Sequence, residues 1–296
     1  YILFLHLASA HHILAEPGMS STWKIVNTSY MMYLAVMGSM IHGLTVPGAI
    51  EAAQRRNGYT RGAFEWLTKA PWGNPAFAGM FLSLVMFGFI GGISGVVLGT
   101  EQLNVLMHNT IYVPGHFHGT VVAGTTLAFM AMTYLVVPLI FQRDILWPGL
   151  AKLQPFVFGI GAGGISLFMM GAGTLGVARR HWDMSLTDAM HGFEYPAAAY
   201  LMMGLNGIFA VLAAIGGVMF IVIVVGSILA GPRLDVAGAK LHFPLHDKSR
   251  EFVAEYGSYP TVKLPGTIIL VGIFFASFVL YYFVNWKYLS ELWLFR

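Results

Sequence analysis

The stretch Tyr-Val-Pro-Gly-His-Phe-His, residues 112–118, opens a long apolar run that continues to Pro138. On a helix, residues two positions apart point about 200° away from each other. The imidazoles of His116 and His118, placed in this way, cannot bind one ion together. The stretch therefore predicts that each histidine binds a different metal centre, on opposite sides of a single helix.

The composition indicates a membrane protein. The 296-residue chain is 57% hydrophobic and 10% charged, whereas about a quarter of the residues in a soluble domain are charged. The absence of cysteine excludes disulfides, thiolate-bound zinc, iron–sulfur clusters and covalent haem attachment through this chain. The formal net charge of +3 is small and spread over loops, which gives no case for a nucleic-acid partner.

Long apolar stretches predict an all-α integral membrane protein, because a membrane-spanning helix needs about 20 mainly apolar residues. We expect one membrane domain over 1–296 with about seven spanning helices, at roughly 1–15, 22–47, 75–99, 113–141, 153–177, 195–230 and 264–286. The polar segments 50–74 and 231–263 are expected to be loops. The chain opens with Tyr1 directly in an apolar stretch, so we expect the start to be internal to a longer protein or to a split subunit.

If successive loops lie on alternate sides of the bilayer, most lysines and arginines fall on one side. Eleven of the 16 lysines and arginines fall in the loops 48–74, 142–152 and 231–263, and the other five fall on the opposite side. The positive-inside rule then places the first set in the cytoplasm. His11, His12, His116 and His118 come to a similar depth, toward the outer face of the cytoplasmic membrane, which favours one shared site.

His11 and His12 are adjacent inside the first apolar stretch. They could be a polar pair bonded to carbonyls at a helix end. Ionisable residues inside a membrane are usually functional, and neutral imidazole is a common ligand for copper and iron. The depth shared with His116 and His118 favours metal ligands. We further expect Gly115 to leave space beside His116 for a large planar group.

Other polar residues leave alternatives open. Arg179 and Arg180 lie on the side expected to be poor in cations, so they could neutralise anions such as haem propionates, or they could be a solvated loop pair. Ser39, His42 and Thr45 recur every third residue; they could conduct protons, although hydrogen-bonding between helices is the favoured interpretation. We expect this chain to bring no carboxylate to the metal site, because its acidic residues fall in loops or at span ends.

Several motifs together resemble the catalytic subunit of the haem–copper oxygen reductases, and most closely its B-type branch. They are His11-His12, Ala15-Glu16-Pro17-Gly18, Thr22-Trp23-Lys24, the segment from Pro71-Trp72-Gly73-Asn74-Pro75 to Phe77, and the segment from His108-Asn109-Thr110 to His116-Phe117-His118. The resemblance implies that the chain forms the C-terminal part, helices seven to thirteen, of a twelve- to thirteen-helix bundle.

The resemblance also implies roles for individual residues. His11 and His12 would bind the copper that faces the high-spin haem, His116 would be the proximal ligand of that haem, and His118 would bind the low-spin haem. Phe117 would lie between the two haems. His108, Asn104, Arg179 and Arg180 would lie near haem propionates, with Asn104 standing where B-type members usually carry an aspartate.

The same resemblance implies partners. The third copper histidine, the cross-linked tyrosine and the other low-spin haem ligand belong to preceding helices of the family, so the N-terminal half or another chain would supply them. A subunit II-like electron-accepting subunit, a cytochrome c or quinol donor and the lipid bilayer would complete the assembly.

The sequence motifs are compatible with four functions of different rank. A terminal oxidase that reduces dioxygen with proton pumping ranks first, and a nitric oxide reductase of the same superfamily, with copper or non-haem iron, ranks second. A haem-binding electron-transfer anchor has no use for His11 and His12, and in a transporter the histidine motifs would be a coincidence.

Overall fold

The computed structural model describes residues 18–27, 32–179, 195–234 and 261–291. This part of the chain is helical, with two isolated β-bridges and no strand. The helices are α2 (Ser21–Ile25), α3 (Met32–Arg56), α4 (Glu65–Thr68), α5 (Pro75–Met86), η3 (Phe87–Gly92), α6 (Ile93–Gly99), α7 (Glu101–Met107), α8 (Tyr112–Phe117), η4 (His118–Thr126), α9 (Leu127–Phe141), α10 (Pro148–Thr174), α11 (Ala197–Ala230) and α13 (Pro265–Ser290).

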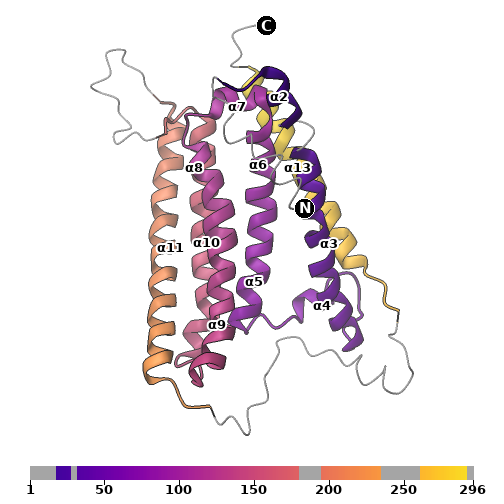
Figure 1. Ribbon diagram of the computed structural model, residues 1–296, viewed down its shortest axis with the longest axis vertical. Coiled ribbons are helices and arrows are strands. Elements are labelled where there is room, and N and C mark those ends of the chain that lie inside the picture. Colours follow the sequence, from indigo (N-terminus) through magenta and orange to yellow (C-terminus); the bar gives the residue numbers. More distant parts are fainter. Residues whose placement is uncertain (1–17, 28–31, 180–194, 235–260, 292–296) are drawn as a thin grey trace.

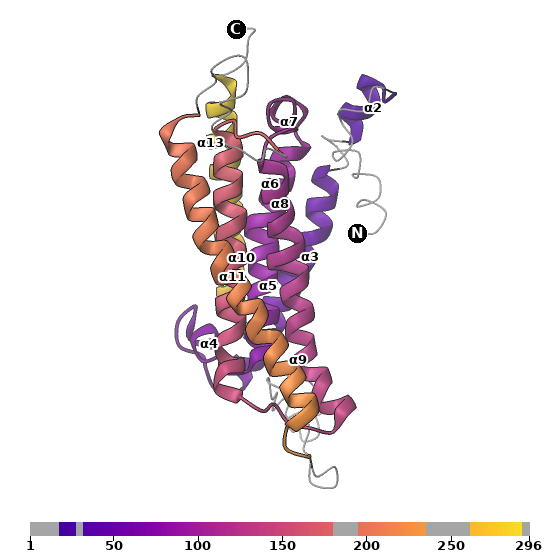
Figure 2. The ribbon, with the colours of Figure 1, turned by 90° about the vertical axis from the view of Figure 1, so that its left-hand side faces the viewer.

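Five continuous helical rods among these residues are long and apolar enough to cross a membrane: Pro75–Gly99, Tyr112–Phe141, Pro148–Thr174, Ala197–Ala230 and Pro265–Ser290. They lie side by side in a bundle (Figures 1 and 2). Large apolar side chains such as Ile208 and Leu229 of α11 are 65% and 72% exposed. Soluble proteins rarely expose apolar surface so widely, and the all-α membrane fold is confirmed.

The rods begin where the sequence supplies start signals. Asn74 caps α5, because its side-chain oxygen accepts a hydrogen bond from the backbone N–H of Phe77 at 3.1 Å. Pro75, Pro148 and Pro265 occupy the first turns of α5, α10 and α13, where the missing N–H has no partner to lose. The five rods consequently start and end within a few residues of the expected spans.

The expected spans at the N-terminal end differ from the structure. The stretch 1–15 lies outside the described residues, and 22–47 is replaced by the short helix α2 and by α3, which runs to Arg56. The segment 50–56, expected to be a loop, is therefore helical. Two of its polar side chains, Glu51 and Gln54, have partners within the fold: Gln54, for example, donates to the backbone oxygen of Lys69 at 2.8 Å.

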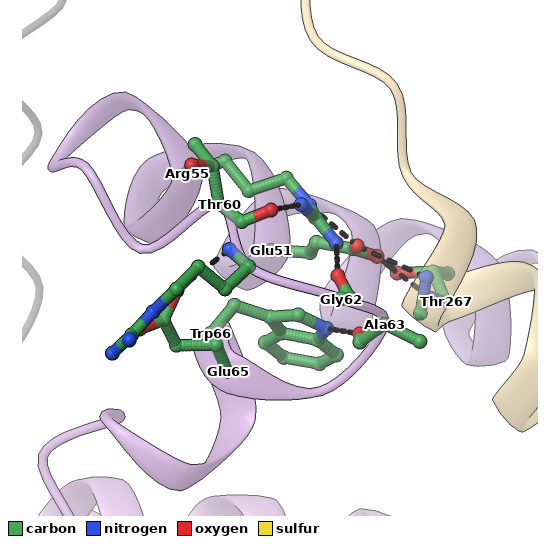
Figure 3. Close-up of polar contacts among 10 residues, drawn as sticks. Glu51, Arg55, Thr60, Gly62, Ala63, Glu65, Trp66 and Thr267 are labelled. Atoms are coloured by element: carbon green, nitrogen blue, oxygen red, sulfur yellow. Dashed lines mark hydrogen bonds and ion pairs between the residues drawn. The ribbon is translucent and has the colours of Figure 1, made fainter.

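Glu51 joins the end of α3 to the start of α13 (Figure 3). Its buried carboxylate accepts hydrogen bonds from the backbone N–H groups of Gly266 and Thr267, at 3.0 and 2.6 Å, and from the Thr267 hydroxyl at 2.7 Å. Arg55 completes the set with an ion pair at 2.8 Å. A carboxylate at this position also complements the positive end of the α13 dipole.

Two rods change their helical hydrogen-bonding pattern midway. The middle of Pro75–Gly99 is the π-helix η3, and the rod Tyr112–Phe141 contains the π-helix η4. These wide turns pack against each other, and a Cβ added at Gly91 of η3 would come within 2.6 Å of the Thr120 side chain in η4. π-helical segments are rare and occur frequently at functional sites. This contact therefore indicates a candidate functional region of the bundle.

Candidate functional site

His116 and His118 stand at the join between α8 and η4. The rod starts beside the end of α10, where the Ile111 N–H donates to the Val177 oxygen at 2.8 Å. Pro114 lies in the first turn of α8, as its fixed φ allows. The two histidines therefore lie within the first two turns of a rod whose start is attached to a neighbouring helix.

The ring of His116 lies against α6. The residue is 5% exposed, and its Nδ1 atom is 2.8 Å from the hydroxyl oxygen of Ser94, which is fully buried. The Ser94 hydroxyl also lies 2.5 Å from the Ile90 oxygen and 3.0 Å from the Gly91 oxygen. A hydroxyl has one proton, and both carbonyls can only accept it.

It follows that the Ser94 oxygen accepts a hydrogen bond from the Nδ1–H of His116. In a neutral imidazole the other nitrogen then carries the lone pair. The hydrogen bond thus places the lone pair of His116 on Nε2.

His118 has the same tautomer for a different reason. Its Nδ1 lies 2.7 Å from the carbonyl oxygen of Pro114, one turn earlier in the helix. Because a carbonyl can only accept, Nδ1 is the donor and Nε2 carries the lone pair. Metal-bound histidines almost always donate their other ring N–H to a carboxylate, a carbonyl or a water.

The residue between the histidines is on the surface of the described chain. Phe117 is 39% exposed, and its ring centroid lies 5.6 Å from that of His116 at 51°. Val121, one turn later, is 50% exposed. The two side chains give this part of the rod an exposed apolar surface.

The expectation for Gly115 is wrong. A Cβ at this position would lie 2.8 Å from the backbone nitrogen and Cγ of Met170 and 3.0 Å from the Cβ of Met169. The Gly115 oxygen also accepts a hydrogen bond from Ser166 at 2.6 Å. Gly115 therefore allows close packing of α8 on α10, and the space beside it is filled by protein.

The start of α8 and the end of α10 bring two predicted site residues together. Thr110 and Ala178 form an antiparallel bridge, and the Arg179 N–H donates to the Asn109 oxygen at 2.6 Å. Arg179 therefore lies beside the segment that begins with His108. Arg180 lies outside the described residues.

Asn104 is buried in α7, a short helix that the sequence did not indicate. Its side-chain nitrogen donates to the Leu98 oxygen at 2.7 Å, and its backbone oxygen accepts from the His108 N–H at 2.7 Å. Asn104 thus holds α6, α7 and His108 in a fixed arrangement.

For the other predicted residues the structure gives fewer contacts. His11 and His12 lie outside the described residues, and within the part that is described no three histidine, aspartate or glutamate side chains gather as a metal site would require. In α3, the Thr45 hydroxyl donates to the Ile41 oxygen of its own helix at 2.7 Å. That bond joins no second helix.

Sequence reasoning missed Ser94 and the pairing of the buried Tyr112 with the partly buried Tyr281. Tyr112, one turn before His116, has its hydroxyl 3.1 Å from that of Tyr281 in α13. Both pairings link residues far apart in sequence, and neither has a local motif. The only signal for Ser94 was a hydroxyl within the small-residue run at 91–95.

Comparison with known proteins adds family evidence. The family described as Cytochrome C and Quinol oxidase polypeptide I matches residues 1–219. Cytochrome c oxidase subunit 1 of Thermus thermophilus is 36% identical over 223 residues, which are 73% of this chain and 37% of that protein. Cytochrome c oxidase polypeptide 1 of Halobacterium salinarum is 29% identical over 121 residues, 40% of this chain and 20% of that protein.

A solved structure shows a similar fold. The cryo-EM structure of a haem–copper terminal oxidase dimer has a TM-score of 0.70 and 27% identity, and the match covers 96% of this chain and 48% of that chain. The chain therefore spans about half the length of this structure, and less of the two relatives. The family match over most of its residues and the shared helical bundle show that the chain belongs to the subunit I family of the haem–copper oxidases.

Proposed function

We propose that the chain is part of the catalytic subunit of a respiratory terminal oxidase. The assembly reduces dioxygen to water at a high-spin haem and copper centre and couples the reaction to proton translocation. The observation that carries the proposal is the hydrogen bonding of His116 and His118. Each ring donates from Nδ1 to a fixed acceptor, and each keeps its lone pair on Nε2.

The described residues fit a haem-binding site. Two histidines on one rod have the tautomer that binds iron through Nε2, and their ring positions are held by different acceptors. His116 would hold the high-spin haem and His118 the low-spin haem, with Phe117 between them. The haems and copper would supply the electron transfer and oxygen chemistry, while the chain holds and orients them.

Residues at one end of the bundle would bind the propionate groups of the haems. His108, Asn104 and Arg179 lie on the connected segments α7, 108–111 and 177–179, and Arg180 follows directly in sequence. Guanidinium groups bind carboxylates through paired hydrogen bonds. His11 and His12 would hold the copper, or a non-haem iron, from the preceding segment.

The chain needs a partner to complete this site. The exposed apolar side chains Phe117 and Val121 offer a surface for the N-terminal half of the subunit, or for a separate chain with the remaining ligands. A subunit II-like electron acceptor and a cytochrome c or quinol donor would supply electrons. The assembly would lie in the cytoplasmic membrane with its metals toward the outer face.

Two substitutions test the haem assignments against each other. In the purified assembly, His116→Ala should abolish the carbon monoxide difference spectrum of the high-spin haem and leave the low-spin band. His118→Ala should remove the low-spin band instead, so each variant is the control for the other. Retention of both haems in wild-type proportion by either variant would refute the proposal.

A further inference from the structure

His116 and His118 differ in what holds them. The Nδ1–H of His118 donates to a carbonyl in its own helix, one turn away. The Nδ1–H of His116 donates to a hydroxyl on another rod, 22 residues earlier in the chain. The direction of the His118 ring is therefore held within its own helix, whereas the ring of His116 is held by a hydrogen bond to a side chain of α6.

From this difference we infer that Ser94 is a positioning residue that sets the ligand strength of His116 toward the high-spin haem, without acting on His118. The inference rests on the proposed function. Ser94 touches neither haem iron nor substrate; it acts through the imidazole ring of His116. A stronger hydrogen bond at Nδ1 makes Nε2 more basic, because second-sphere acceptors raise the basicity of a bound histidine.

The geometry leaves the Ser94 hydroxyl little freedom. Its single proton is directed at the backbone oxygens of Ile90 and Gly91, at 2.5 and 3.0 Å, and its oxygen accepts from His116 at 2.8 Å. Ser94 is 0% exposed, so bulk water does not compete for these bonds. Hydrogen bonds in such a chain polarise one another, which strengthens the one to His116.

The helical pattern explains why Ser94 faces the histidine. Ser94 is the second residue of α6, directly after η3, and the π-helical turn changes the direction of the residues that follow it relative to a regular α-helix. The next residue, Gly95, leaves room for the ring: a Cβ there would lie 3.1 Å from Cε1 of His116. Ser94 thus holds one edge of the imidazole, and the bare backbone of Gly95 lies against another.

Ser94→Ala in the assembled holoenzyme tests the inference. The variant should lower the iron–histidine stretching frequency of the ferrous high-spin haem, measured by resonance Raman spectroscopy, because the Fe–Nε2 bond weakens. It should also raise the midpoint potential of that haem, since a less basic ligand favours ferric iron less. Loss of a residue that hydrogen-bonds a metal-binding histidine costs at least about tenfold in metal affinity. If that tenfold loss applies to ferric relative to ferrous iron, the potential rises by about 59 mV for one electron.

Two further variants make the result specific. Ser83→Ala removes another buried serine of the same rod, whose hydroxyl donates to its own helix at Met80, 2.7 Å away; it should change neither readout. Ser94→Thr keeps the hydroxyl, so its iron–histidine stretching frequency should equal that of the wild type. The low-spin haem potential should stay constant in all three variants.

The inference is overturned if Ser94→Ala leaves the stretching frequency unchanged, or if both haems shift together. It is also overturned if Ser94→Thr behaves like Ser94→Ala. Failure of this kind leaves the proposed function standing, because both haems are still present. Failure of the proposed function shows instead as a normal haem spectrum in His116→Ala.

Discussion

At the scale of single residues, backbone contacts decide which polar groups meet. The backbone of Arg179 lies beside the His108 segment because its N–H donates to the Asn109 oxygen and the adjacent Ala178 pairs with Thr110. These contacts fix the path of the chain at the end of α10. Backbone hydrogen bonds between two distant parts of the sequence therefore bring the backbone of Arg179 next to the residues that follow His108.

Replacing Arg179 by Gln should lower the potential of the nearest haem, because a positive charge stabilises the reduced state. A change of about 1.4 kcal/mol, within reach of a charge-assisted hydrogen bond, lowers a one-electron potential by about 59 mV. Redox titration of the purified assembly measures this shift. Lys287→Gln is the control, since that cation pairs with Glu291 at 2.6 Å, and equal potentials in wild type and Arg179→Gln would show Arg179 to be a loop residue.

The sequence predicted which histidines to follow but not what holds them. His116 and His118 could be chosen because they begin a long apolar run, and their role as haem ligands stays a prediction. Ser94 could not be chosen, because its contact with His116 depends on how two π-helical segments pack. Gly115 was misjudged for the same reason: the identity of the neighbour, Met170 on α10, is not written in the local sequence.

At the scale of elements, hydropathy predicted the five apolar rods well and failed where polar residues form part of a helix. The segment 50–56 contains Glu51, Gln54, Arg55 and Arg56, a composition typical of loops. In the structure Glu51 caps α13 and Gln54 bonds to the α4 region. Distant partners thus satisfy Glu51 and Gln54, and no local sequence pattern indicates them.

Glu51→Gln should loosen the attachment of α13 to α3. Removing one partner of a buried ion pair costs about 3–5 kcal/mol, and Arg55 would keep its charge at a largely buried position. Thermal unfolding in detergent, followed by circular dichroism, should show a clearly lower midpoint. Glu65→Gln removes the carboxylate that pairs with Arg61, whose side chain is 87% exposed, and should lower the midpoint less. Equal effects would contradict the assigned role of Glu51.

The pH dependence of this attachment follows from the same bonds. Glu51 lies beyond the five apolar rods; burial alone would raise its pKa, but hydrogen bonds from Thr267, Arg55 and Gly266 outweigh burial and lower it below 4.5. A lowered folded-state pKa gives stability that is present above the unfolded-state value and is lost as the pH falls through the folded-state value. The midpoint of thermal unfolding of the wild type should fall as the pH drops below about 4.5. The midpoint of Glu51→Gln should fall less over that range.

At the scale of the whole molecule, the bundle places alternate connections at opposite ends. The end of α3, the start of α5, the α9–α10 connection and the start of α13 lie at one end, and α7 and the start of α8 lie at the other (Figure 1). The first group carries the cation-rich connections. The cytoplasmic side assigned to that group stays a prediction of the positive-inside rule.

Single cysteines test this sidedness cleanly, because the natural chain has none. Thr60 and Gln102 are exposed and lie in the α3–α4 connection and in α7. Thr60→Cys should react with an impermeant maleimide only in inside-out vesicles, and Gln102→Cys only in right-side-out vesicles. Reversed labelling would place the histidines toward the cytoplasm.

In the proposed function, histidines of this chain bind two haems and a copper. Metal content of the purified assembly, measured by plasma mass spectrometry with haem quantified by its pyridine adduct, tests it most directly. We expect two haem irons and at least one copper for each copy of this chain, with the copper bound by His11 lost in His11→Ala. Iron in excess of haem, with no copper, would contradict it.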